Sequence, residues 1–297
     1  MRILVAGDSL GLPRPYRIND YSFDETELAV SYENTYSAII NKKLLELFQM
    51  DPFTEVINMS RRSQTLEGVY SEFVDNFFFH QPDIFILHVG IVDCWFREEL
   101  NGGQRVPINK YEKYLDNILQ MIRYRPLCKL IIVGICPTSK KMENRYPGIN
   151  SEIRAYNKIL MSKVDSKSIF YIDMEHYVDN GDIYDYLLPD DHHLNVNGNK
   201  VVASELLKII KNIIYMNQGL GLNREADIVQ MNLYFKKAYK SYSMNLDTIY
   251  NLLVTLFENQ EYEELKRLIQ NINEAKINDE GIDSLVKDIL CYFNNSD

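Results

Sequence analysis

Three side chains, one near the start of the chain and two about 180 residues later, have the types and spacing of a nucleophilic triad. Ser9 lies in AGDSL, directly after an apolar run that predicts a strand, so a sharp turn would present its hydroxyl to a cleft. Asp190 and His193 stand in D-x-x-H spacing within PDDHHLNVNGN. A carboxylate so placed orients the histidine ring and leaves its other nitrogen to accept a proton from a distant serine. We therefore predict Ser9 as nucleophile, His193 as base and Asp190 as orienting carboxylate.

Each part of this triad has an ordinary structural alternative. A serine in such a turn also serves as the N-cap of a helix. Of the adjacent His192 and His193 we expect at most one to be catalytic, and the other, like Asp191, would be a surface or packing residue. We favour His193 because it lies three residues after Asp190 and directly precedes a Leu-Asn pair.

The elements that must position these residues alternate between strands and helices. Short apolar runs predict parallel strands at 3–6, 56–57, 84–87, 130–133 and 169–172. Apolar residues at three- and four-residue intervals predict helices at 35–48, 111–124 and 153–164. We expect a further helix at 197–216. This order predicts a three-layer α/β/α domain around a five-stranded parallel sheet, with the site at the carboxyl ends of the strands.

A unit of another class is expected to follow. Glycines and polar residues interrupt the helical pattern at 217–225, and strand-like runs cease afterwards. We predict an α/β domain over 1–216 and an all-α domain over 223–297. The second contains amphipathic helices without a clean repeat of about 34 residues, which favours a small bundle over tetratricopeptide-like pairs. Its helices are the expected surface for a protein partner or for self-association.

Composition excludes several functional classes. A net charge of −10 opposes a nucleic-acid partner, because such proteins depend on clustered Lys and Arg. No apolar run reaches the roughly 18 residues that span a bilayer, and the first residues lack the apolar core of a signal peptide. We therefore expect a cytoplasmic protein without membrane contact. The four cysteines are scattered and no phosphate-binding glycine motif occurs, so we expect no metal and no cofactor.

Taken together, AGDSL and D-x-x-H-L-N-x-x-G resemble the SGNH/GDSL hydrolase family over about residues 1–216. The resemblance implies a flavodoxin-like SGNH fold and a carboxylic ester hydrolase that works through an acyl-enzyme. It also implies the roles of the triad. Ser9 would attack the ester carbonyl, His193 would act as base and then as acid, and Asp190 would fix the histidine tautomer.

Two further blocks of that family supply an oxyanion hole, and the sequence departs from both. INMSRRSQT has Ser63 where glycine is usual, and HVGIVDCWFR keeps Gly90 and Asp93 but has Val92 in place of the asparagine of G-x-N-D. The implied oxyanion donors are the backbone amides of Ser9, Ser63 and Gly90. Losing the asparagine donor typically costs about 10²- to 10³-fold in rate. Another polar group, such as Arg62 or Arg97, is an alternative donor.

The implied substrate is a small O-acylated metabolite or glycan precursor, with an O-acetyl ester favoured. GIVDC-x-x-R, and LPR followed by YENTY, are similar to GDSL-like proteins of bacterial polysaccharide or other biosynthetic loci. A guanidinium suits a carboxylate or phosphate, so the expected substrate-binding residues are Arg14, Arg62, Asp93 and Arg97. A structural salt bridge of Arg14 or Arg97 is an equal alternative. The Phe77-Phe78-Phe79 run favours core over an acyl pocket.

Two other functions remain open at this point. An acyltransferase would use the same triad, with the long segment 11–34 shielding the intermediate from water. A degenerate SGNH module, impaired at its oxyanion hole by Val92, would serve instead as a binding protein through its C-terminal helices.

Overall fold

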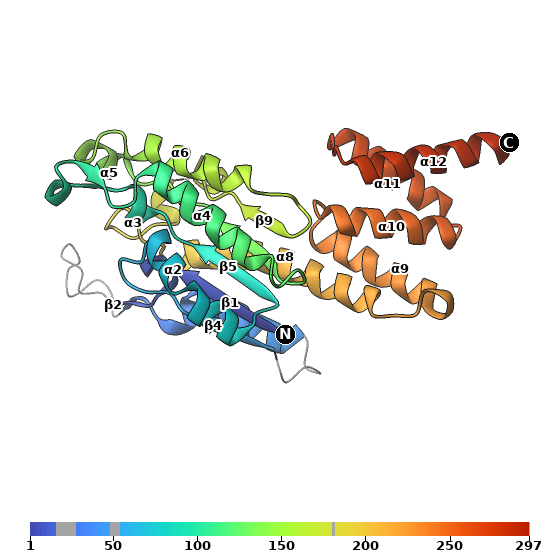
Figure 1. The fold of residues 1–297 in the computed structure, drawn as a ribbon, viewed down its shortest axis with the longest axis horizontal. Coiled ribbons are helices and arrows are strands. Elements are labelled where there is room, and N and C mark those ends of the chain that lie inside the picture. The colour runs from blue at the N-terminus through green and yellow to red at the C-terminus, as the bar shows by residue number, and fades with distance from the viewer. Residues whose placement is uncertain (16–27, 48–53, 180–181, 297) are drawn as a thin grey trace. The chain divides into compact units, whose positions relative to one another are not determined.

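The computed structural model describes residues 1–15, 28–47, 54–179 and 182–296 (Figure 1). The chain divides into two units, Met1–Leu206 and Leu207–Asp297. The division falls inside helix α8 (Val196–Leu220), earlier than the predicted break at 217–225. Met216, near the end of α8, belongs to the core of the second unit, so the last turns of this helix pack with the helices that follow it.

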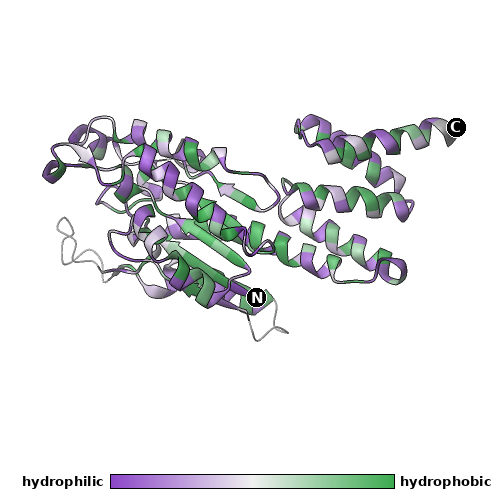
Figure 2. Cartoon of the chain, in the orientation of Figure 1, coloured by the Kyte–Doolittle hydropathy of each residue, from purple (hydrophilic) through white to green (hydrophobic). Residues whose placement is uncertain are grey.

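The sheet of the first unit has five parallel strands, which confirms the predicted α/β/α class. Its strand order is β4-β1-β5-β8-β9. The strands are β1 (Arg2–Gly7), β4 (Glu55–Asn58), β5 (Ile84–His88), β8 (Lys129–Val133) and β9 (Ile169–Ile172). Every residue of the central strand β5 is buried, as expected where helices cover both faces. In Figure 2 the strands are apolar along most of their length.

Helices cover the two faces of this sheet. On one face, α2 (Leu66–Ser71), α4 (Ile108–Ile122) and α6 (Ile149–Ser162) lie side by side (Figure 1). On the other, the start of α1 (Tyr36–Leu47) meets α8, where the amide of Tyr36 donates to Oδ1 of Asn199 at 3.0 Å. The helix α4 buries positions 111, 115, 118 and 122, the stripe that a period of 3.6 residues places on one side.

Shorter elements lie in the connections. They are two hairpins, β2 (Arg14–Pro15) with β3 (Leu28–Val30) and β6 (Phe96–Arg97) with β7 (Gly103–Gln104), and the helices α3 (Ile91–Cys94), α5 (Lys140–Arg145) and α7 (Glu175–Asp179).

The second unit is helical. After the end of α8 come α9 (Arg224–Ser241), α10 (Leu246–Glu258), α11 (Tyr262–Glu274) and α12 (Glu280–Ser296). Their apolar faces enclose a core that includes Phe235, Leu253 and Leu265, each with no exposed surface. A buried amide joins three of the helices, because Nδ2 of Asn212 donates to the carbonyl of Ala238 and to Oγ1 of Thr248, both at 2.9 Å. Within the described ranges, no helix is long and apolar enough to cross a membrane.

Candidate active site

Ser9 lies in the turn that follows strand β1. The chain leaves the sheet at Gly7 and enters a short 3-10 helix, Ser9–Gly11, which Asp8 caps by accepting a 2.9 Å hydrogen bond from the amide of Leu10. A Cβ atom on Gly7 would lie 2.7 Å from Oγ of Ser60, so only glycine fits this close approach. The turn leaves the Ser9 side chain half-buried at the carboxyl end of the sheet.

The hydroxyl of Ser9 meets the predicted histidine. Its Oγ lies 2.8 Å from Nε2 of His193. Nδ1 of His193 lies 2.8 Å from Oδ2 of Asp190, whose Oδ1 also accepts the backbone amide of His193 at 3.0 Å. Asp190 thus holds both the ring and the main chain of the histidine, which fixes the ring direction. The structure brings all three predicted triad residues into one run of hydrogen bonds.

The charges around this run favour an ionised carboxylate and a neutral imidazole. Burial by itself raises the pKa of Asp190, but the hydrogen bond and charge of His193, with the charge of His192, hold that pKa well below its usual range. Burial lowers the pKa of His193. Asp190 opposes this shift, whereas the charges of Arg14 and Arg62 add to it, and the net pKa is below the ordinary value. A neutral imidazole is the state that a general base requires.

The neighbouring residues of the same loop have packing roles. The ring of His192 lies against the rings of His193, at 4.1 Å between centroids, and Trp95, at 4.9 Å. Burial lowers the pKa of His192 to about 4. Asp191 is buried and accepts hydrogen bonds from the hydroxyls of Ser139 and Tyr184. These contacts match the alternative that the sequence left open for His192 and Asp191.

The loops after β4 and β5 carry two of the three predicted oxyanion donors, Ser63 and Gly90. Ser63 has φ 57°, so a serine adopts the left-handed backbone that usually requires glycine. Gly90 has φ 147° and stands at the start of α3, where a Cβ atom would lie 2.3 Å from Cδ1 of Ile135. Val92, two residues later, is 7% exposed and carries no side-chain donor. Whichever group replaces the family asparagine, it therefore comes from another position.

One predicted substrate-binding residue is placed elsewhere by the structure. Asp93 has no exposed surface, and its Oδ1 accepts a 2.9 Å hydrogen bond from the amide of Leu66. Because α3 directs this carboxylate toward the start of α2, it joins two loops of the site and does not reach a substrate. Burial raises the pKa of Asp93 to about 8.

The three predicted arginines have different environments. Nη2 of Arg14 lies 3.7 Å from Oδ2 of Asp190, which makes Arg14 a counter-ion of the triad carboxylate. Arg62 is exposed in the loop that carries Ser63, and Arg97 lies with its Cζ 4.8 Å from the centre of the Trp95 ring. Trp95 thus contacts both Arg97 and His192. The sequence did not predict this role, and the one signal for it was the position of Trp95 between Asp93 and Arg97.

The triad loop also contains three groups of the kind that bind metals. Three ligand atoms, one each from Asp190, His192 and His193, lie within 4.8 Å of one another. The hydrogen bonds described above already use Oδ2 of Asp190 and Nδ1 of His193, while Nδ1 of His192 lies 2.8 Å from the carbonyl of Asp190. A metal would have to replace these bonds, so the arrangement suits a serine triad better than a metal centre.

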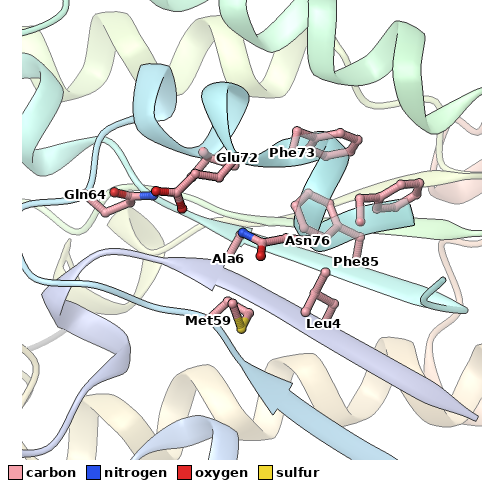
Figure 3. A pocket seen from close by; sticks show the side chains of 10 residues that line it. Leu4, Ala6, Met59, Gln64, Glu72, Phe73, Asn76 and Phe85 are labelled. Atoms are coloured by element: carbon pink, nitrogen blue, oxygen red, sulfur yellow. The ribbon is translucent and has the colours of Figure 1, made fainter. Parts of the chain in front are cut away.

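The aromatic run at 77–79 lies only partly in the core, because Phe77 is buried and Phe78 half-buried but Phe79 is 79% exposed. Phe77 stacks on Phe73 with ring centroids 4.6 Å apart, and both pack edge-on against Phe85 of strand β5. A cavity beside them, with Gln64 and Asn76 among its lining side chains, has room for about one water molecule (Figure 3). It is too small for an acyl chain.

Comparisons with known proteins agree with this fold. Residues 19–201 match the model of the GDSL-like Lipase/Acylhydrolase family, a range that begins after Ser9 and includes Asp190 and His193. No curated protein matches the chain.

Similar solved structures include LAE5, an alpha/beta hydrolase enzyme from the metagenome of Lake Arreo, with 19% identity and a TM-score of 0.53, covering 69% of this chain and 93% of that one. A lipase/acylhydrolase from Enterococcus faecalis has 16% identity and a TM-score of 0.53, covering 69% and 92%. A mutant of Axe2, an acetylxylan esterase from Geobacillus stearothermophilus, has 16% identity and a TM-score of 0.52, covering 70% and 92%. At these identities the structures establish the fold of the part they cover.

Proposed function

This chain belongs to the GDSL-like lipase/acylhydrolase family, and we propose that it hydrolyses a carboxylic ester through an acyl-enzyme on Ser9. The observation that carries the proposal is the run of two 2.8 Å contacts from Ser9 through His193 to Asp190. His193 accepts the Ser9 proton as Oγ attacks the ester carbonyl, and then donates it to the departing alcohol. In the second half, His193 deprotonates a water that attacks the acyl-enzyme. The bond between the acyl carbon and Oγ of Ser9 then breaks, His193 returns the proton to Oγ, and the free acid leaves the regenerated serine.

The negative charge that develops on the carbonyl oxygen requires hydrogen-bond donors. We assign these to the backbone amides of Ser9, Ser63 and Gly90, in the loops after β1, β4 and β5. The φ of 57° at Ser63 supports this assignment, because it preserves at a serine the backbone angle that glycine ordinarily provides. Val92 adds no donor, so we expect turnover below that of a site with a complete set.

The proposed substrate is an O-acyl ester, preferably an O-acetyl ester, of a small metabolite or glycan precursor. Two observations support an acetyl group on a carbohydrate. One is the fold similarity to Axe2, an acetylxylan esterase. The other is the resemblance of the GIVDC block to GDSL-like proteins of polysaccharide loci.

The test compares wild type with Ser9→Ala. Wild type should hydrolyse p-nitrophenyl acetate and be labelled by a fluorophosphonate probe, whereas Ser9→Ala should lose the label and at least about 10³-fold of the turnover. Ser162→Ala, which removes an exposed hydroxyl bonded only to the carbonyl of Ile159 within α6, is the matched control. Equal labelling and turnover in Ser9→Ala and wild type would reject the proposal.

Acyl transfer with the same triad is distinguished by adding an acceptor alcohol to that assay. Residues 16–27, within the segment that the sequence suggested as a shield for the intermediate, lie outside the described residues. No structural observation therefore favours transfer over hydrolysis. The intact hydrogen bonds from Ser9 through His193 to Asp190 argue against a degenerate binding module.

A further inference from the structure

Arg62 is an exposed cation that has no acidic partner among the residues that the structure describes. Its neighbour Arg61 forms an ion pair with Glu72, but Arg62 has no hydrogen bond or ion pair to any described residue. The charge of Arg62 nevertheless acts on His193, whose pKa it lowers. Arg62 is therefore an exposed cation, in the loop that carries Ser63, whose charge reaches the catalytic histidine.

Arg97 is a second such cation, connected to the triad through ring contacts. Its Cζ lies 4.8 Å from the Trp95 ring centre, the Trp95 ring lies 4.9 Å from that of His192, and the latter lies 4.1 Å from that of His193. Nε of Arg97 is buried and has no hydrogen-bond partner among the described residues. A buried donor left without a partner costs free energy, so a ligand that accepts from it is favoured.

The chain as a whole is acidic. It carries 42 Asp and Glu against 32 Lys and Arg, and some of its other arginines pair with acids, as Arg2 does with Glu55 and Arg154 with Glu175. An uncompensated cation near His193 disfavours the imidazolium that forms during the reaction. An anion bound at the same place would remove that penalty.

We propose that the ester substrate carries a carboxylate or phosphate group, which Arg62 and Arg97 bind beside Ser9. This inference rests on the proposed function and specifies its substrate class. The guanidinium is suited to both anions because its donors match two acceptor oxygens at once. The half-buried ring of Trp95, with that of Tyr146 at 5.3 Å, borders the proposed subsite and gives the body of the substrate an apolar surface.

The experiment uses three acetyl esters of similar size: 4-acetoxybenzoate, 4-acetoxyphenyl phosphate and the neutral methyl 4-acetoxybenzoate. The readout is the ratio of kcat/KM for each anionic ester to that for the neutral one. In Arg62→Gln and Arg97→Gln we expect this ratio to fall by about 10-fold, the usual effect of losing a charge-assisted hydrogen bond. Arg61→Gln, an adjacent arginine paired with Glu72, should keep the wild-type ratio.

The two anionic arms identify the group that binds, since the larger fall marks the preferred anion. If Arg97→Gln does not fold, Arg97→Lys tests the same residue, because it retains the charge but loses the guanidinium donors that match two acceptor oxygens at once. A ratio unchanged in both Arg62→Gln and Arg97→Gln overturns the proposal.

A binding measurement separates this inference from the proposed hydrolysis. In Ser9→Ala the esters stay intact, and titration followed by ligand NMR should show both anionic esters binding more tightly than the neutral one. Adding Arg62→Gln should weaken anion binding by about 10-fold. If wild type hydrolyses no ester while these binding results hold, the hydrolase proposal fails and the anion subsite stands. If neither anion binds Ser9→Ala more tightly than the neutral ester, the subsite is wrong.

Discussion

The hydroxyl of Ser139 donates a 2.7 Å hydrogen bond to Oδ1 of Asp191, the residue between Asp190 and the two histidines. Ser139 also caps helix α5, because its Oγ accepts from the amide of Met142 at 3.1 Å. The hydroxyl of Tyr184 donates to the same carboxylate oxygen at 2.8 Å. The loop that carries Asp190 and His193 is thus attached to the start of a helix through Asp191, a residue with φ 73°.

We expect Asp191→Ala to lower the free energy of unfolding by about 3 kcal/mol, because it removes two hydrogen bonds to a buried carboxylate, one of them fully buried, and places alanine in a left-handed conformation. Urea denaturation measures the change. Turnover should fall as well, since Asp190 and His193 lose their attachment. Asp185→Ala, at an exposed position, should change stability by less than about 0.5 kcal/mol. Equal stability of the two variants would show that this attachment is not needed.

Ser63→Gly should be at least as stable as wild type. Residue 63 has φ 57°, which costs a residue with a side chain about 1 kcal/mol relative to glycine. Because the proposed oxyanion donor is the backbone amide, turnover of p-nitrophenyl acetate should stay within about twofold of wild type. Ser63→Val, with a β-branched side chain at the same φ, should lose stability. If Ser63→Gly loses most of its turnover, the hydroxyl and not the amide is the important group.

Much of the sheet could be predicted from sequence because its central strands β1, β5 and β8 are buried along most of their length. Their apolar runs are then continuous, as in 84–87 and 130–133, and all five predicted runs fall within β1, β4, β5, β8 and β9. The domain boundary was harder to place. The helical pattern of α8 continues to Leu220, and a sequence shows where a helix ends but not which neighbours its side chains contact.

The site was predicted unevenly for a similar reason. Asp190 and His193 lie three residues apart on one loop, so their contact is local and follows from spacing. Asp93 lies in a four-residue helix whose direction depends on tertiary packing, and its burial against Leu66 left no local pattern. The pairing of Arg14 with Asp190 joins segments far apart in the chain, and only the folded structure brings them together.

The pH dependence of kcat/KM should reflect the lowered pKa of His193. His193 acts as a base only when its ring is neutral. The acidic limb of the kcat/KM profile should therefore lie below the ordinary histidine pKa of about 6.5. The charged groups acting on this ring are Asp190, which raises its pKa, and Arg14 and Arg62, which lower it. Arg62→Gln should therefore shift the limb to higher pH, while Arg61→Gln should not. A limb that is unmoved in Arg62→Gln would place that guanidinium away from His193.

Stability should fall as pH rises because of the buried carboxyl of Asp93. Burial, followed by the charge of Asp8, raises its folded-state pKa to about 8, above the unfolded value near 3.9. As pH rises, the native state therefore keeps the Asp93 proton longer than the unfolded state. The contribution of this protonated carboxyl to the free energy of unfolding is complete below about pH 4 and is lost as pH rises to about 8. In Asp93→Asn, stability relative to wild type should improve by more than about 1 kcal/mol between pH 5 and pH 9. Parallel stability curves for the two proteins would contradict the raised pKa, and Asp185→Asn is the exposed control.

Val92→Asn should restore a side-chain donor to the oxyanion hole. Position 92 lies two residues after Gly90, whose amide is a proposed donor, and the resemblance to G-x-N-D places the family asparagine there. We expect kcat for p-nitrophenyl acetate to rise by about 10- to 100-fold, since the new bond would strengthen as charge develops on the oxygen. Residue 92 is 7% exposed, so the introduced side-chain amide lacks a full set of hydrogen-bond partners in the free enzyme. The free energy of unfolding should therefore fall by about 1–3 kcal/mol. Val92→Ala, which removes the same packing without adding a donor, should lose stability with no gain in kcat. If Val92→Asn is no faster than Val92→Ala, the side chain at 92 does not face the oxyanion, and the donor that completes the hole lies elsewhere in the site.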